Sequence, residues 1–181
     1  MPKGNFPKRS SRRVQQATLC LLIRERRGTK EVCLAMKKRG FGQGLWNGVG
    51  GKAKEGETPK VASFREAFEE IGVHVRKTRK IALLHFYFPD DPKKKDWNQD
   101  VHVFLAQMWK GEPKETEEMR PQWFKLDEVP FNKMWADDLL WLPRVFAGEL
   151  IEGWFSFDDN NQVLDFKIKN VEEGGRTSTK R

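Results

Sequence analysis

The sequence predicts one domain of the α/β class. Short apolar runs of strand length recur along the chain, and only two stretches have a helical pattern. Strands and helices do not alternate regularly, which argues against a doubly wound parallel sheet. With 181 residues, 38% apolar and 33% charged, the chain is long enough for one domain with a sizeable core, and no internal repeat divides it.

Six strand-like runs share apolar residues bounded by polar or turn-forming ones: residues 17–24, 31–36, 81–88, 101–109, 153–157 and 163–168. Gly28 lies in the turn between the first two runs, and the polar segment 158–162 joins the last two, so both pairs are predicted hairpins. The polar segment 89–100 is a predicted loop. Residues 137–150 form a predicted helix that is interrupted near Pro143.

The other predicted helix covers residues 59–71. Thr58 is a suitable N-cap, and Pro59 fits the first helical position, where its missing N–H costs nothing. Gly72 stands where a left-handed C-terminal residue is needed. The boundaries of this helix are therefore defined at both ends.

The two sides of this helix differ in chemistry. At about 100° per residue, one arc is apolar and is expected to pack: Val61, Phe64, Phe68 and Ile71. The opposite arc gathers three carboxylates: Glu66, Glu69 and Glu70. Like charges at these spacings repel by about 0.3 kcal/mol per pair. Two interpretations follow, either an acidic solvated face screened by Lys60 and Arg65 or a site for a hard divalent cation.

The net charge of +8 lies at the two ends of the chain. Residues 1–13 and 174–181 are rich in Lys and Arg, contain no acidic residue and together account for the whole excess. Their composition is typical of disordered tails. Three interpretations remain open: solvated tails, weak nonspecific contact with polyanions, and a mitochondrial address in the N-terminal segment.

The sequence indicates a cytoplasmic protein without a membrane partner, with the nuclear or mitochondrial pool as alternatives. No apolar run approaches the roughly 18 residues of a membrane span, and the N-terminus has no apolar segment of signal-peptide type. Cys20 and Cys33 lie inside apolar runs, where buried reduced thiols are expected and no chemistry is assigned.

The stretch from Gly51 to Val73 matches a longer motif. Gly51 is followed after five residues by Glu57 and after seven more by "REAFEEIGV", which begins at Arg65. This spacing resembles the Nudix box at every fixed position. Ala67 departs from the larger aliphatic residue usual in the family, which is expected to loosen packing but removes no ligand.

Further segments extend the resemblance over roughly residues 16–170. "LAMKKRGFGQGLWNGVGGKAKEGET", "DVHVF", "EMRPQWF" and "PFNKMWADD" are similar to the MutT-homologue branch of the Nudix hydrolases, which sanitises oxidised purine nucleoside triphosphates. The resemblance implies the Nudix fold, a mixed β-sheet sandwiched between α-helices. It divides the chain into a basic tail (1–15), a Nudix domain (16–171) and a second basic tail (172–181), and we expect a monomer.

The implied reaction is attack by water on a phosphorus of a triphosphate such as 8-oxo-dGTP or 2-hydroxy-dATP, which releases monophosphate and pyrophosphate. Because substrate and carboxylates are both anionic, Mg²⁺ is the implied cofactor, with Mn²⁺ as the alternative ion. By resemblance the metal ligands are Gly51, Glu66, Glu69 and Glu70. Glu70 is also the favoured base, Glu118 is a second candidate base, and Arg65 fixes a glutamate by ion pairing.

Glu57 has two interpretations, a direct role or a brace for its loop. The resemblance also implies a purine pocket formed by Asn47, Trp135, Asp137 and Asp138, with walls from Phe41, Phe86, Met119 and Trp141. It places Lys37 near the sugar or phosphates of the substrate, and Thr18 is a further substrate-binding residue. Flat apolar faces together with an amide and two carboxyls suit a purine. The structural alternative is a surface turn in which Asp137 or Asp138 caps a helix and Trp135 belongs to the core.

Two other functions remain open. One is a Nudix hydrolase of another substrate, such as a diphosphoinositol phosphate, a dinucleoside polyphosphate or an RNA 5′ end. The other is a noncatalytic Nudix-fold module that binds nucleic acid through its tails, for which eroded metal ligands would be expected. None of the box residues is eroded.

Overall fold

The computed structural model describes residue 6, residues 14–89 and residues 97–173, so most of both predicted tails and of the predicted 89–100 loop lies outside the described residues. The elements within these residues are β1 (Gln15–Arg26), β2 (Thr29–Lys37), β3 (Trp46–Asn47), α1 (Pro59–Ile71), β4 (His74–Tyr87), β5 (Gln99–Lys110), β6 (Met119–Lys125), α2 (Asp138–Phe146), β7 (Ile151–Phe157) and β8 (Val163–Asn170), with short 3₁₀ helices η1 (Leu126–Glu128) and η2 (Phe131–Lys133).

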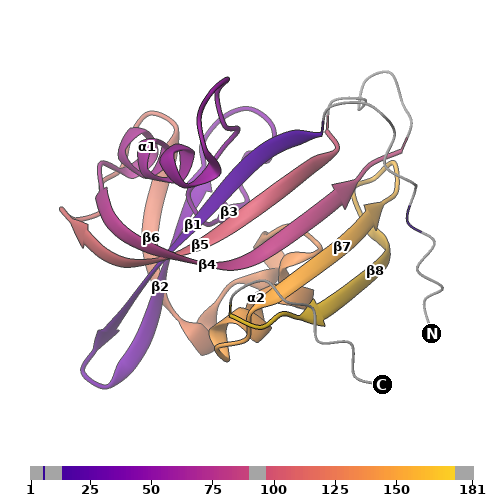
Figure 1. Cartoon of the computed structure of the whole chain (residues 1–181). Helices are drawn as coiled ribbons and strands as arrows, with labels where there is room; N and C mark the ends of the chain where they lie inside the picture. Colours follow the sequence, from indigo (N-terminus) through magenta and orange to yellow (C-terminus); the bar gives the residue numbers. More distant parts are fainter. Residues whose placement is uncertain (1–5, 7–13, 90–96, 174–181) are drawn as a thin grey trace.

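The strands of the described chain form one mixed sheet (Figure 1). Their order is β3-β2-β1-β5-β4-β7-β8, and β6 pairs with β2. The pairs β1/β5 and β4/β7 are parallel, and the remaining pairs are antiparallel. The sheet therefore brings the first strand of the chain beside β5 at its centre.

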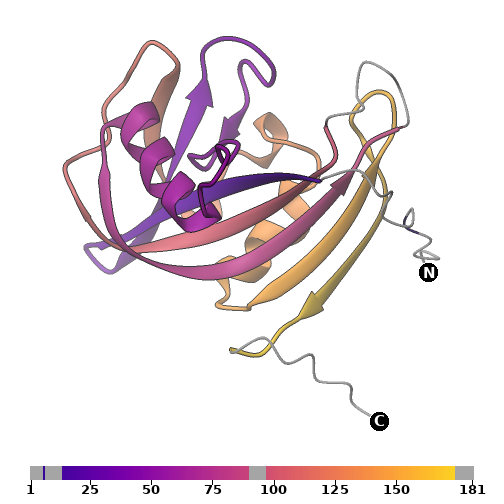
Figure 2. The same ribbon diagram turned by 45° about the horizontal axis from the view of Figure 1, so that its top comes forward.

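The two helices cover opposite faces of this sheet, as Figures 1 and 2 show. Leu22 of β1 belongs to the core on the α1 side, together with Ile71. Its neighbour Leu21 belongs to the core on the α2 side, together with Trp141. Because successive side chains of a strand point to opposite faces, the apolar run in β1 supplies both cores, and the predicted fold class is confirmed.

Both predicted hairpins are confirmed. Arg27 and Gly28 form a two-residue turn between β1 and β2, with φ of 53° and 75°, as hairpin turns of the primed types require. In the β7–β8 connection, the Asp158 carboxylate accepts from the N–H groups of Asn160 and Gln162 at 2.8 Å each. The turn residues thus satisfy the backbone locally.

The strand bounds differ from the prediction in several places. β4 begins at His74 and not at Ile81, because register shifts near Val75 and Lys80 disturb the alternation that would mark the strand in the sequence. β3 and β6 were not predicted. β3 has only two residues, and β6 contains Pro121 and pairs in the described sheet with β2 alone, which is the edge position that proline tolerates.

The caps of α1 agree with the prediction. Thr58 is the N-cap and its hydroxyl accepts from the Val61 N–H at 3.3 Å, Pro59 is the first helical residue, and Gly72 has a φ of 71°. These residues limit the helix to Pro59–Ile71 because each end satisfies backbone groups that the helix leaves unpaired.

The predicted packing face of α1 is confirmed for Phe64 and Ile71 and wrong for Val61 and Phe68. Val61 and Phe68 are about half exposed, while Glu70 is buried. The side chains that face the sheet are mainly small: Ala62, Ser63, Ala67, Glu70 and Ile71. The helix lies close to the loop before it, so small residues fit where larger apolar ones were expected, and the carboxylates do not form a separate outer face.

The predicted interruption of the second helix was also wrong. α2 begins at Asp138 and continues through Pro143 to Phe146, where Gly148 with a φ of 90° follows. A proline removes one intrahelical hydrogen bond, here the one to the carbonyl of Leu139. The helix is short and tolerates this loss.

Cys20 and Cys33 are free and buried, as expected. Burial raises the pKa of each thiol to about 12, so both are protonated at neutral pH. None of the helices in the described part of the chain has both the length and the apolar character that crossing a membrane requires.

Candidate active site

The loop between β3 and α1 lies directly against β1. The N–H groups of Thr18 and Cys20 donate to the carbonyls of Gly51 and Val49 at 2.9 and 2.6 Å. A Cβ atom at Gly50 would collide with the carbonyl of Thr18. Glycine is therefore required by close backbone approach at this position, because Gly50 is not in the positive-φ region.

Glu70 is attached to this loop from the helix side. Its Oε2 accepts from the Gly50 N–H at 2.9 Å, and the side chain is buried. Burial raises its pKa to about 8, and the negative charges of Glu66 and Glu118 add to the effect. The Gly50 N–H and the Lys37 charge act in the opposite direction. A carboxyl in such surroundings gains most from a nearby cation.

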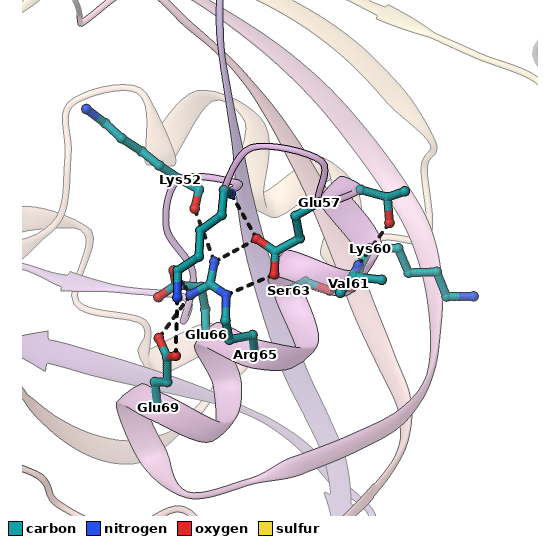
Figure 3. A network of polar contacts seen from close by, with 10 residues as sticks. Lys52, Glu57, Lys60, Val61, Ser63, Arg65, Glu66 and Glu69 are labelled. Carbon is teal, nitrogen blue, oxygen red and sulfur yellow. Dashed lines mark hydrogen bonds and ion pairs between the residues drawn. The ribbon is translucent and has the colours of Figure 1, made fainter.

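Arg65 organises the other carboxylates of the motif, as Figure 3 shows. Its guanidinium donates to Glu57 (2.9 Å from both Nε and Nη2), to Glu66 (2.7 Å) and to Glu69 (2.9 Å). The Glu57 carboxylate also accepts from the Lys54 N–H at 2.9 Å. The Arg65 hydrogen bonds and the Lys54 N–H lower the pKa of Glu57 to about 2. Glu57 therefore braces its loop through Arg65.

Oxygen donors lie beside this loop from two glutamates and the backbone. Within the described residues, no three His, Cys, Asp or Glu side chains already converge as a metal cluster. Glu66 nevertheless lies against Gly51, where an added Cβ would be 2.8 Å from its carboxylate, and Glu70 binds the adjacent Gly50 N–H. Carboxylate and carbonyl oxygens suit a hard cation. Glu66, Glu70 and Gly51 thus fit the ion.

Glu69 and Gly51, two of the metal ligands that the resemblance implies, already have partners within the chain. The Glu69 side chain is half exposed and pairs with Arg65 and Lys54, at 2.9 and 3.8 Å. The Gly51 carbonyl already accepts from Thr18, which leaves one lone pair for a further partner. The Glu69 carboxylate would have to exchange an ion pair before it bound a cation.

Glu118, the second candidate base, is exposed and pairs with Arg39 at 2.8 Å. Hydrogen bonding to Arg39 lowers its pKa. It remains close enough to Glu70 for its charge to raise the pKa of that residue. Glu118 is thus an exposed, ionised carboxylate near Glu70, whereas Glu70 itself is buried.

A cavity of about 240 Å³ opens beside the loop. All ten residues predicted to bind the substrate line it, together with Gly51 and Glu70: Thr18, Lys37, Phe41, Asn47, Phe86, Met119, Trp135, Asp137, Asp138 and Trp141. Glu66, Glu69, Arg65 and Glu118 are not among the lining residues. The sheet and both helices contribute to the wall of this cavity.

Asp137 and Asp138 are both buried in the cavity wall. Asp137 accepts from the indole N–H of Trp141, and Asp138 accepts from the backbone N–H of Trp135, at 3.0 Å each. Although Asp137 holds the N-cap position of α2, its side chain makes no capping hydrogen bond. The helix-cap alternative therefore holds for the position of Asp137 but not for its side chain, while Asp138 binds the turn before the helix.

Burial changes the protonation of this acid pair. It raises the pKa of Asp137 to about 6. Burial and the neighbouring charge of Asp137 raise the pKa of Asp138 well above its usual range. Two carboxyls that share a poorly solvated site do not both ionise readily. At neutral pH the pair is expected to retain one proton.

Asn47 and Lys37 present polar groups to the same cavity. The Asn47 Oδ1 accepts from the Gly48 N–H at 2.8 Å, so the Nδ2 group is the one that remains for a ligand. Lys37 ends β2 and contributes positive charge near Glu70. The cavity thus offers a donor, a cation, two acidic groups and flat apolar walls.

Several cavity residues were missed in the sequence: Phe88, Gln99, Phe157 and Asn161. Phe88 could have been found from its two-residue spacing to Phe86, since such residues share one face of an extended segment. Gln99 and Asn161 belong to a strand start and a turn, where nothing in the local pattern indicates a site.

The comparisons with known proteins agree with this geometry. The family model of the NUDIX domain matches residues 13–145. The chain belongs to the Nudix family. This chain is 43% identical to the oxidized purine nucleoside triphosphate hydrolase of Danio rerio over 156 residues. The aligned region covers 86% of this chain and 95% of the zebrafish protein. The mouse (Mus musculus) protein of the same name is 42% identical, covering 86% and 94%.

A solved structure extends the comparison to the fold. The MutT protein from Bacillus halodurans superimposes with a TM-score of 0.73 at 26% identity, over 86% of this chain and 97% of that one. The Nudix hydrolase fold therefore holds across the described sheet and its helices, and the chain is a Nudix hydrolase in both sequence and architecture.

The close approach of the loop to β1 makes a testable prediction. Gly50→Ala should reduce the free energy of unfolding by about 3 kcal/mol, because its Cβ meets the backbone of β1, which cannot move aside. Gly51→Ala is the matched control, since the nearest atoms to its Cβ belong to a side chain, the Glu66 carboxylate, and not to the backbone, and it should cost about 1 kcal/mol or less. Urea denaturation of both variants measures the difference. Equal losses would contradict the packing described.

Proposed function

We propose that the protein hydrolyses oxidised purine nucleoside triphosphates to the monophosphate and pyrophosphate. The observation that carries the proposal is the cavity, whose wall combines the buried acid pair of α2 with Glu70 of α1. The names of the zebrafish and mouse relatives, at 43% and 42% identity over nearly their full lengths, support this substrate class.

The cavity wall supports recognition of a purine. Phe41, Trp135 and Phe86 offer flat apolar faces for the ring system. Asn47 offers a donor through Nδ2, and the two aspartates offer a donor and an acceptor while they share a proton. An oxidised purine carries an additional keto or hydroxyl group at its edge, which such a set can pair.

The residues around Glu70 support the reaction. A bound Mg²⁺ would neutralise phosphate charge and lower the pKa of a water molecule. Glu66, Glu70 and the Gly51 carbonyl would hold the ion, while Arg65 keeps Glu66 oriented from the other side. Lys37 would attract the phosphates to the same part of the cavity. Glu70 would accept the proton from the attacking water.

Glu70 is preferred over Glu118 as the base because of its surroundings. Glu70 lines the cavity, whereas the Glu118 carboxylate is exposed and paired with Arg39. A bound Mg²⁺ would favour the ionised form of Glu70, which is the form that a base needs. The Glu118 carboxylate would have to break its ion pair with Arg39 before it could act as the base.

The alternative substrates fit less well. A diphosphoinositol phosphate would bring several phosphates against Asp137 and Asp138, and such a contact between like charges is unfavourable in a buried site. A noncatalytic nucleic-acid module would not require a box in which every carboxylate is retained. We also propose that Mg²⁺ is the cofactor, with Mn²⁺ as the alternative ion, and that the protein acts as a cytoplasmic monomer.

Replacement of the base tests the reaction. Glu70→Gln keeps the shape of the side chain and an acceptor for Gly50, but removes its charge, so turnover of 8-oxo-dGTP should fall roughly 10²-fold or more. Pyrophosphate release at saturating Mg²⁺ measures it, and the thermal unfolding midpoint checks the fold. Glu55→Gln is the matched control, since Glu55 lies on the preceding loop outside the fixed box positions. Near wild-type turnover in Glu70→Gln would refute the assignment.

Replacement of the acid pair tests purine recognition. Asp137→Asn and Asp138→Asn fix the donor and acceptor pattern that a mobile proton would otherwise adjust. Each change should alter the ratio of kcat/KM for 8-oxo-dGTP and 2-hydroxy-dATP, with about 1 to 3 kcal/mol for each lost pairing. The Mg²⁺ dependence should change less than this ratio.

The pH dependence of the kcat/KM ratio provides a second test of the acid pair. Because the Asp137 pKa is raised to about 6, raising the pH through this value removes a proton from the wild-type pair and shifts its substrate ratio. Asp137→Asn lacks this carboxyl, so its ratio should be flatter between about pH 5 and pH 7, whereas Asp138→Asn keeps Asp137 and its ratio should still change in this range. Equal losses on both purines at every pH would mean that the acids maintain the fold and do not recognise the base.

A further inference from the structure

A continuous group of aromatic rings surrounds one side of the cavity. Phe41 lies between two indoles, with ring centroids 5.0 Å from Trp135 and 4.5 Å from Trp97. Trp97 also meets Phe88 edge to face at 5.4 Å, and Phe88 stacks on Phe157 at 4.7 Å. The purine residues inferred from the sequence include Phe41 and Trp135 but not Trp97.

Phe41 projects from a glycine-rich loop against these rings. It is 54% exposed although it lines the cavity. Its loop contains three glycines at alternate positions, Gly40, Gly42 and Gly44, with φ between 77° and 83°. Chains of this kind have many accessible conformations. The position of the Phe41 ring therefore depends on the two indole rings that contact it.

The two indoles that clasp Phe41 come from different parts of the chain. Trp135 lines the cavity, and its ring approaches Gly42 so closely that an added Cβ would be 2.9 Å away. Trp97 precedes β5, is half-buried and does not line the cavity. It contacts two residues that do, Phe41 from the glycine loop and Phe88 from the end of β4.

We propose that Trp97 is a positioning residue for nucleotide binding, which holds the Phe41 ring against the purine through its simultaneous contact with Phe88. The inference rests on the proposed function, because it assigns Phe41 to the purine. Trp97 acts on binding and not on the reacting atoms, since the rings that it contacts, Phe41 and Phe88, belong to the cavity wall. Loss of Trp97 should weaken binding and leave the chemical step unchanged.

Three variants separate this role from a structural one. Trp97→Ala should raise the KM for 8-oxo-dGTP by roughly 3- to 10-fold, as expected for the loss of one or two aromatic contacts, with kcat within about twofold. Trp97→Phe should restore most of the affinity because it retains an aromatic face.

Trp154→Ala is the matched control. Trp154 stacks on His85 and lies beneath Lys169, and its neighbours Gly153 and Phe155 point to the cavity side of β7, so its own ring lies on the other face. Its KM should be that of the wild type. An unchanged KM in Trp97→Ala, or equal changes in Trp97→Ala and Trp154→Ala, would overturn the proposal.

A ligand-free measurement separates this proposal from the proposed function. The N–H groups of Gln43, Gly44 and Leu45 donate within the loop at 3.1, 2.8 and 3.0 Å. If Trp97 holds the loop through Phe41, hydrogen exchange of these amides should accelerate in Trp97→Ala and not in Trp154→Ala. Unchanged exchange would overturn the proposal even if wild-type turnover supports the function. Accelerated exchange without wild-type turnover of 8-oxo-dGTP would retain the Trp97–Phe41 coupling and reject the substrate.

Discussion

The close contact between Gly50 and β1 is the constraint on which the site depends. There is no room for a side chain between Gly50 and the Thr18 carbonyl, and the loop is fixed to β1 by hydrogen bonds on both sides of Gly50. The Gly50 N–H then points to Glu70. One contact therefore sets the distance between the sheet and α1.

This arrangement separates the carboxylates of α1 into two groups. Arg65 hydrogen-bonds Glu66 and Glu69, together with Glu57 of the preceding loop, and its single positive charge offsets part of their negative charge. Glu70 is left buried beside a single backbone donor, with a raised pKa. The same principle applies to Asp137 and Asp138, whose burial retains a proton that an exposed pair would lose. Loss of hydration on burial, more than the charge of neighbouring groups, therefore raises the pKa values of Glu70, Asp137 and Asp138.

The sequence predicted those features that depend on local or strictly spaced residues. The Thr58 and Gly72 caps defined α1, the box spacing indicated the carboxylates, and the predicted purine residues all line one cavity. Features that depend on tertiary packing were missed. Val61 and Phe68 are exposed although their spacing matches an apolar helix face, because helical periodicity does not encode which side of the helix meets the sheet. Similarly, Asn161 and Trp97 reach the site region only because the sheet brings distant segments together.

The central claim is that the carboxylates attached to the glycine loop and the purine cavity form one active site. A crystal structure with Mn²⁺ and a nonhydrolysable 8-oxo-dGTP analogue, located by anomalous scattering, tests it most directly. We expect a manganese peak within coordination distance of the Glu70 and Glu66 carboxylates, with the oxidised base against Asp137 and Asp138. A peak bound only elsewhere, or a base outside the cavity lined by these aspartates, would contradict the account.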